Sequence, residues 1–109
     1  MFGQSFPGPR LLYPVTDHID LTGQDYLEFK WERSDFVNTR SYDFRLYKGY
    51  NTVQSTLILK KNVSSTEYPV KIEASTFEIN QVYTWVLIRV AFNGNKSDKS
   101  FSSFKIIKK

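Results

Sequence analysis

His18 is the only histidine of the 109-residue chain, and it stands close to two carboxylates, Asp17 and Asp20. Imidazole nitrogen and carboxylate oxygen bind Zn²⁺ and other divalent cations, so this segment comes nearest to a metal site. A stable site would need ligands from a second cluster, and the sequence contains no cysteine and no other histidine. We therefore expect a solvated loop at His18, with no metal and no cofactor bound.

The sequence also lacks the patterns of the common catalytic sites. Without cysteine there is no thiol nucleophile, no disulfide scaffold and no zinc ribbon. The five glycines are scattered and form no phosphate-binding loop, and no serine lies in a nucleophile-elbow pattern. The sequence thus predicts that the protein is not an enzyme, since any hydrolytic triad would have to depend on His18.

Aromatic and basic side chains alternate at Tyr47, Lys48 and Tyr50, a mixture that oligonucleotide-binding β-proteins use to stack bases and hold phosphates. The net charge is only +4, however, and the acidic residues are dispersed among the basic ones. Outside residues 105–109 there is no dense basic stripe, so a solvated sheet face is favoured over a nucleic-acid interface. No apolar run approaches the about 18 residues that cross a membrane, and no membrane insertion is expected.

Period-two alternation of apolar and polar residues runs through most of the chain, and no segment carries a helical stripe. With 40% hydrophobic and 17% aromatic residues, the chain suffices for one domain with its own core. We predict an all-β fold, a two-sheet antiparallel β-sandwich of about seven strands. The segments expected as strands are 10–14, 19–21, 26–31, 41–48, 56–60, 67–74, 83–92 and 101–107. The aromatic residues predicted to form the core are Phe29, Trp31, Tyr42, Phe44, Tyr83 and Trp85.

Prolines and glycines indicate where the elements end. The glycines and prolines of residues 1–9 are typical of a flexible linker, so the β-sandwich is expected to occupy residues 10–109, as a domain cut from a longer protein. Pro69 would remove a hydrogen-bond donor from a central strand, and segment 67–74 is therefore expected at a sheet edge or with a bulge. The longest apolar run, 83–92, is expected at the centre of a sheet.

Several short motifs follow one another in the order and spacing of a known family. They are Pro9, Leu11 and Pro14 in the opening segment, Phe29-Lys30-Trp31, Tyr42 with Phe44 and Leu46, Phe77 six residues before Tyr83, Trp85 and Leu87, and finally Gly94 and Phe104-Lys105-Ile106. Together they resemble a fibronectin type III-like domain of the form common in bacterial exported proteins. The resemblance implies an immunoglobulin-like sandwich that serves as a spacer or interaction module within a larger surface or secreted protein.

In such a sandwich Trp31 would fill the centre between the sheets, and Tyr83 would turn its hydroxyl back onto the preceding loop as a tyrosine corner. Two positions depart from the pattern. The usual glycine before the tyrosine is missing, because Asn-Gln-Val stands at 80–82, and Arg89 occupies a position of inward parity. A bulge after Leu87, or a strand that leaves the core there, would reconcile Arg89 with the sandwich.

An outward apolar face is the most informative feature for function. If Tyr83, Trp85 and Leu87 point into the core, Val86 and Ile88 point outward from the same strand. With outward residues of the neighbouring strands they form the predicted interaction face: Arg45, Tyr47, Val86, Ile88, Lys105 and Ile107. Aromatic residues and arginine around an apolar centre are typical of protein interfaces. The alternative is that Lys and Arg stems, or a neighbouring domain, cover these residues.

The resemblance and this face together predict a non-catalytic module of an exported protein, located outside the cell, on the cell surface or in the periplasm. It would act as a spacer, or bind a protein partner or a neighbouring domain. Two other roles stay open. Tyr13, Tyr47 and Tyr50 could stack on the sugar rings of a carbohydrate. The face around Val86 and Ile88 could instead join copies of the chain, as in a homo-oligomer or a surface filament.

Overall fold

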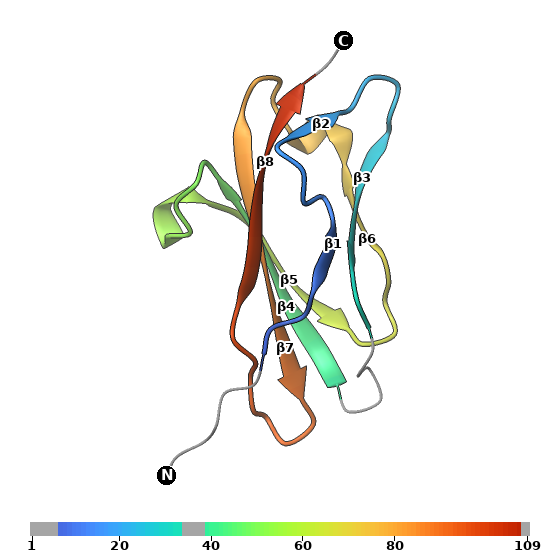
Figure 1. The fold of residues 1–109 in the computed structure, drawn as a ribbon, viewed down its shortest axis with the longest axis vertical. Coiled ribbons are helices and arrows are strands. Elements are labelled where there is room, and N and C mark those ends of the chain that lie inside the picture. The colour runs from blue at the N-terminus through green and yellow to red at the C-terminus, as the bar shows by residue number, and fades with distance from the viewer. Residues whose placement is uncertain (1–6, 34–38, 108–109) are drawn as a thin grey trace.

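The computed structural model describes residues 7–33 and 39–107, and over these the chain is all-β, with eight strands in two sheets. The sheets pack face to face, with β1, β3 and β6 on the right of Figure 1 and β8 at the front of the other sheet. The strands are β1 (Leu11–Tyr13), β2 (His18–Asp20), β3 (Tyr26–Trp31), β4 (Thr39–Lys48), β5 (Leu57–Ser64), β6 (Val70–Glu73), β7 (Val82–Ala91) and β8 (Ser100–Ile107). Nowhere in the described part of the chain is a helix long or apolar enough to cross a membrane.

One sheet has the order β1-β3-β6 and the other β2-β8-β7-β4-β5. Neighbouring strands run antiparallel except β2 and β8, which are parallel, so the prediction of a purely antiparallel sandwich is wrong at this edge. The reason is that the chain leaves β1 and crosses to β8 without reversing its direction (Figure 1). The segment between β1 and β2 is held against the larger sheet at Pro14, whose carbonyl accepts a hydrogen bond from Nε1 of Trp85 at 2.9 Å.

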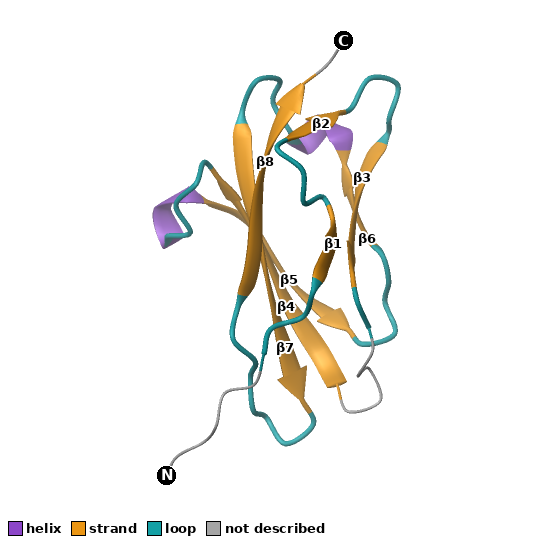
Figure 2. Ribbon diagram, viewed as in Figure 1, coloured by secondary structure: helices purple, strands orange, loops and turns teal. Residues whose placement is uncertain are grey.

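The strands, orange in Figure 2, begin and end within two residues of the predicted bounds except β5 and β6. β7 is the middle strand of the larger sheet and β6 is an edge strand, both as predicted. β6 starts only at Val70, after Pro69, and not at residue 67 as expected. β5 continues past residue 60 to Ser64, where the sequence suggested a loop. Val63, fully buried opposite Tyr42, is the only buried residue of this strand. One inward apolar residue thus suffices to hold the end of a half-exposed edge strand in the sheet.

Aromatic rings from both sheets form the core, and the six aromatic residues named from the sequence all lie in it. Phe29 of β3 is the central ring. Its ring centroid lies 5.1 Å from that of Phe44, 5.1 Å from Trp85, 6.0 Å from Phe104 and 6.4 Å from Phe77. Trp31, expected at the centre, lies instead at the end of β3, where its ring packs against Tyr42 and Tyr68 at 5.1 and 4.9 Å.

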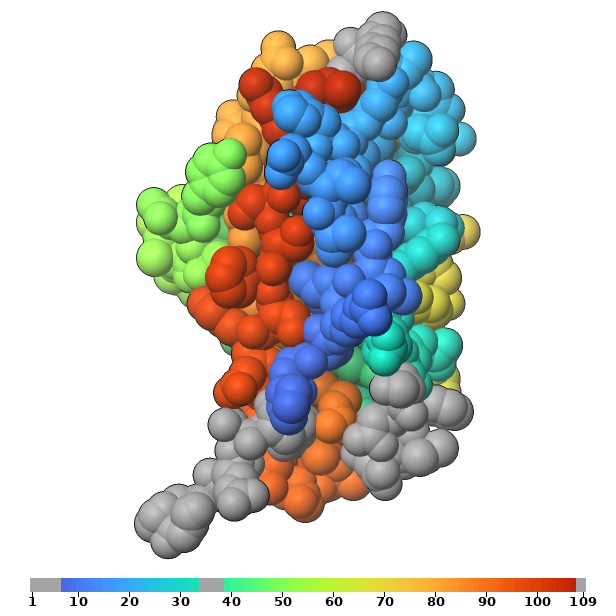
Figure 3. Space-filling view, in the orientation of Figure 1, coloured from blue at the N-terminus to red at the C-terminus, as the bar shows by residue number. Residues whose placement is uncertain are grey.

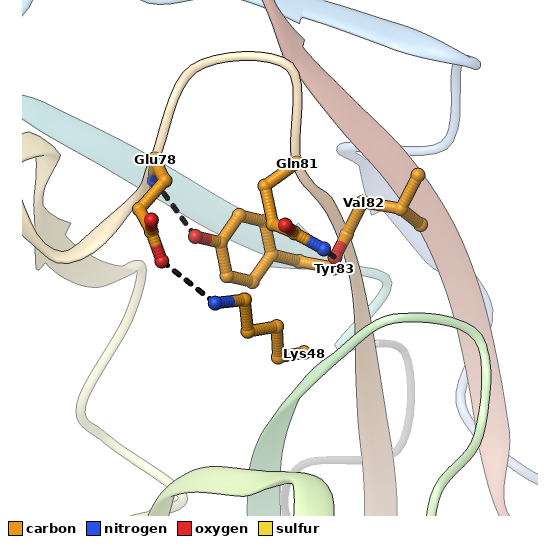
Figure 4. Close-up of polar contacts among 5 residues, drawn as sticks. All are labelled: Lys48, Glu78, Gln81, Val82 and Tyr83. Carbon is orange, nitrogen blue, oxygen red and sulfur yellow. Dashed lines mark hydrogen bonds and ion pairs between the residues drawn. The ribbon is translucent and has the colours of Figure 1, made fainter.

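Tyr83 forms the expected tyrosine corner (Figure 4). Its hydroxyl oxygen accepts a hydrogen bond from the backbone N–H of Glu78 at 2.7 Å, and its ring packs edge-on against Phe77 with centroids 5.0 Å apart. The Glu78 carboxylate in turn pairs with the Lys48 ammonium at 2.8 Å. Asn80 stands where the resemblance calls for glycine, and its φ of 66° lies in the left-handed region that asparagine tolerates better than most residues.

Arg89 keeps its inward parity but lies where β7 has passed the end of the core. Its guanidinium donates a hydrogen bond to Oγ1 of the buried Thr39 at 3.1 Å. In the ladder between β4 and β7, the register shift falls between Thr39 and Ser41 of β4 and not after Leu87. The strand therefore needs no bulge of its own to accommodate Arg89.

Part of the segment expected as a linker belongs to the folded domain. Residues 1–6 of that segment lie outside the described residues. The Pro9 carbonyl, however, accepts a hydrogen bond from the Ser100 hydroxyl at 2.5 Å. A Cβ atom on Gly8 would lie 2.6 Å from the Asp98 carbonyl oxygen, so only glycine fits this approach to the start of β8.

Replacing Tyr83 with phenylalanine would leave the Glu78 N–H without its acceptor. We expect Tyr83→Phe to lower the free energy of unfolding, measured by urea denaturation, by about 1–2 kcal/mol. Tyr50→Phe is the matched control, because Tyr50 is 73% exposed, and it should change stability by less than about 0.5 kcal/mol. Equal stability of Tyr83→Phe and the wild type would show that the corner does not stabilise the fold.

Candidate functional site

The outer face of the five-stranded sheet is where the sequence places an interaction surface, and the strand register shows which residues meet there. The cross-strand pairs are Arg45 with Val86, Tyr47 with Thr84, Asp43 with Ile88, and Val86 with Phe101. Arg45, Tyr47, Val86 and Ile88 therefore form one cluster across β4 and β7. Lys105 and Ile107 lie apart from it, about 13 and 20 Å beyond Phe101 along β8, where they pair with β2.

The loop between β4 and β5 crosses this face. The carbonyl of Gly49 accepts a hydrogen bond from the Thr84 hydroxyl of β7 at 2.7 Å, and further along the loop Thr52 receives one from Lys99, just before β8, at 3.3 Å. The loop surface, light green in Figure 3, lies beside the red surface of β8. With the loop in place, Tyr47 is 5% exposed and Val86 3% exposed. The chain itself thus covers the apolar centre of the predicted face.

Beside this cluster Phe101 stays accessible: it is 61% exposed, and the Lys99 ammonium lies 5.7 Å from its ring centroid. Sequence reasoning left Phe101 out, although it has the same parity in β8 as Lys105. Ile88 is half-buried at the other end of the cluster. The accessible apolar surface is therefore smaller, and displaced toward β8, compared with the face that the sequence indicates.

Arg45 and Asp43 form a two-point ion pair on this face. The guanidinium donates hydrogen bonds to both carboxylate oxygens, from Nη2 at 2.9 Å and from Nε at 3.2 Å. The hydrogen bond to Asp43 raises the pKa of Arg45 above its usual value, so the guanidinium stays charged at any pH at which the protein is folded. Asp43 consequently presents little negative charge to an incoming ligand.

His18 lies in β2 and not in the expected loop, because its backbone pairs with Lys105 of β8. His18 and Asp20 occupy alternate positions of this strand, and both are exposed. One oxygen of Asp20 accepts hydrogen bonds from the backbone N–H and the hydroxyl of Thr22 at 2.9 and 2.6 Å, so this carboxylate closes the turn after β2. Among the described residues, no group of three or more His, Asp or Glu side chains is close enough to hold a metal ion.

A groove of about 540 Å³ runs beside the start of β3. Two tyrosines line it, Tyr13 at 40% exposure and Tyr26 at 50%, together with Gln24, Asp25 and Glu28. Of the three tyrosines expected to stack on sugar rings, only Tyr13 lies here. Tyr47 is buried, so the expectation that it stacks on a sugar is wrong, and Tyr50 lines a separate hollow with His18. The sequence signal for Tyr26 is its parity with Glu28, which places it on the solvent side of β3.

Comparison with known proteins gives no family model and no curated protein that matches the chain. The assignment of a function therefore depends on the geometry described above.

The Thr84 hydroxyl, which also lies 2.6 Å from the Ser103 hydroxyl, is the anchor of the covering loop. We expect Thr84→Val to lower the free energy of unfolding by about 1–2 kcal/mol, because the Gly49 carbonyl and Ser103 lose a buried partner. Amide exchange at Gly49, whose N–H donates to the Val82 carbonyl, should become faster. Thr52→Val removes an exposed contact of the same loop and serves as the control. Unchanged exchange in Thr84→Val would mean that this hydroxyl does not hold the loop on the face.

Proposed function

We propose that the chain is a non-catalytic, fibronectin type III-like β-sandwich module of an exported or cell-surface protein, acting as a spacer or a protein-interaction domain. The observation that carries the proposal is the path of the chain through an elongated body. The Cα atoms extend over 50 × 27 × 20 Å, and the described chain enters at one end of the long axis, below β1, while β8 points out of the other end (Figure 1). Such a module keeps whatever it connects apart.

The sheet arrangement supports the resemblance on which the exported location rests. A sheet of β1, β3 and β6 faces a larger one in which β7 is central, and a tyrosine corner leads into β7. An immunoglobulin-like sandwich has two such layers and, in many cases, such a corner. The assignment to exported or cell-surface proteins, bacterial ones in particular, comes from the resemblance alone.

The packing supports a rigid spacer more than a self-assembling subunit. Phe29, Phe44 and Trp85 interlock both sheets at the centre, and closely packed interiors of this kind have low compressibility. On the outside, the β4–β5 loop leaves Val86 almost fully buried. A second copy of the chain would thus find little of the apolar face on which docking would depend.

Small-angle X-ray scattering tests this function on the single chain and on two copies joined head to tail. We expect the single chain to keep a radius of gyration near the 14.3 Å of its Cα atoms at every concentration, and the joined pair to approach twice the length of one copy. A radius that grows with concentration in the wild type and in Ile79→Lys, but not in Phe101→Lys, would make the chain an assembly subunit instead. Ile79 is the matched control because it is an exposed apolar residue outside this face.

Carbohydrate binding is a second candidate function, and the groove between Tyr13 and Tyr26 favours it. Its volume lies in the range of small-ligand sites, and its half-exposed rings offer flat apolar surfaces beside amide and carboxylate groups. Sugar rings present the matching combination of an apolar face and a rim of hydroxyls.

Titration with neutral hexasaccharides of glucose, xylose and N-acetylglucosamine, followed by amide chemical shifts, tests this second candidate. We expect one of them to shift the amides around Gln24 and Tyr26, and Tyr26→Ala to weaken its binding about tenfold. Tyr50→Ala, which removes an even more exposed ring outside the groove, should leave binding unchanged. Absence of any shift at millimolar saccharide would contradict the candidate.

A further inference from the structure

A second hollow, of about 270 Å³, lies at the other end of the outer face, beyond the covering loop. Its polar lining consists of Arg40, Ser41, Asp43, Lys60, Asn62 and Lys96. They come from β4, from β5 and from the turn between β7 and β8. Three of them are cations that no sequence motif groups together.

A β-bulge in β4 builds one wall of this hollow. Thr39 pairs with Ala91 and Ser41 with Val90, so Arg40 is the extra residue between them. In a regular strand, consecutive side chains point to opposite faces, whereas a bulge turns two of them to the same side. Arg40 and Ser41 accordingly both line the outer hollow.

The pairing of β4 with β5, and of the β7–β8 turn with β7, brings the other lining residues to the hollow. Asn62 of β5 pairs with Asp43, and Lys60, two residues away on the same side of β5, pairs with Arg45. Lys96 is held opposite Val90 by an isolated bridge between the β7–β8 turn and β7. Backbone pairing thus fixes the main chain at Lys60 and Lys96, and the bulge between two paired residues fixes it at Arg40.

The charge of the hollow is not balanced by its own residues. Asp43 is its single carboxylate, and both oxygens of Asp43 accept hydrogen bonds from Arg45. Over residues 7–33 and 39–107, no carboxylate lies within ion-pair distance of Arg40, Lys60 or Lys96. Six other cations of this part of the chain do have such partners: Arg10, Lys30, Arg45, Lys48, Lys61 and Lys71.

The side chains that line the hollow favour a tetrahedral oxyanion over a nucleic acid or a carboxylate. Three cations around one hollow, together with the neutral hydroxyl of Ser41 and the amide of Asn62, fit a tetrahedral oxyanion that offers several acceptor oxygens. No aromatic residue lines the hollow, so a nucleic-acid base would find no ring on which to stack. Two of the three cations are lysines, which act as point charges, whereas planar carboxylates are held best by the arginine fork.

From these observations we propose that the hollow binds a sulfate or phosphate ester group carried on a saccharide chain. The inference goes beyond the role as a spacer and does not depend on it. Sulfate and phosphate esters share the tetrahedral oxyanion that the three cations would surround, and Ser41 and Asn62 supply neutral hydrogen bonds beside it. The rest of the saccharide would extend along the exposed outer side of β5.

The test is an amide chemical-shift titration of the full chain at low salt with four probes. These are a sulfated heparin hexasaccharide, its fully desulfated counterpart, a mannose 6-phosphate disaccharide and hexaglutamate. We expect one or both esters to shift amides around Ser41, Asn62 and Lys96, and the desulfated saccharide to shift none. Which ester binds more tightly identifies the source of the oxyanion. Affinity should fall as salt is raised, because these charges are screened.

Lys60→Gln and Lys105→Gln form a matched pair, since each removes one cation from the outer side of the same sheet. We expect Lys60→Gln to weaken binding of the preferred ester at least fivefold and Lys105→Gln less than twofold. Equal losses would overturn the proposal, because net charge alone would then account for binding. Tighter binding of hexaglutamate, or no shift with either ester at low salt, would overturn it as well. Amide spectra that otherwise match the wild type show that both variants are folded.

Discussion

The ladder between β4 and β7 determines which residues at the centre of the larger sheet face the core and which face outward. Its nine register pairs run from Thr39 opposite Ala91 to Lys48 opposite Tyr83. Because side chains alternate along a strand, this register sends Phe44 inward and Arg45 outward, and a slip by one residue would exchange the core and the outer face. The shift in register at Arg40 falls at the end of the ladder, where the core has ended. The bulge can therefore re-aim side chains without disturbing the packing around Phe29.

The sequence predicted the location of all eight strands and the tyrosine corner at Tyr83, because both depend on local alternation and on short spacings. It did not predict the parallel pairing of β2 with β8. The crossing after Pro14 carries no periodic pattern that would indicate which sheet edge the chain joins. Nor could it predict the bulge at Arg40, because a bulge depends on the register between two strands and not on the pattern of one. The basic hollow around Arg40, Lys60 and Lys96 could not be predicted for the same reason, because the register of the strands brings its residues together.

The alternation of β7 correctly predicts which of its residues face outward, but it does not show whether another part of the chain covers them. Val86 faces outward as predicted, yet the β4–β5 loop crosses the face and leaves it buried. Thr84, a buried polar residue on the same side, accounts for the path of that loop, since its hydroxyl bonds to the Gly49 carbonyl and lies close to Ser103. Buried polar groups that are fully hydrogen-bonded fix one arrangement among several of similar apolar burial. The apolar character of β7 is thus satisfied within the chain.

The cations of the described residues fall into two groups, those paired with a carboxylate and those without such a partner. An exposed ion pair contributes only about 0–1 kcal/mol to stability, so leaving the exposed cations Arg40, Lys60 and Lys96 without a carboxylate partner costs the fold little. Three like charges around one hollow nevertheless repel one another, because separations across a hollow of this size are comparable to the screening length of about 8 Å at physiological salt. A face that serves only as solvated surface would scatter its cations or pair them, as the rest of this chain does. An anion held between Arg40, Lys60 and Lys96 would offset this repulsion, whereas no carboxylate of the described residues lies within ion-pair distance of any of the three.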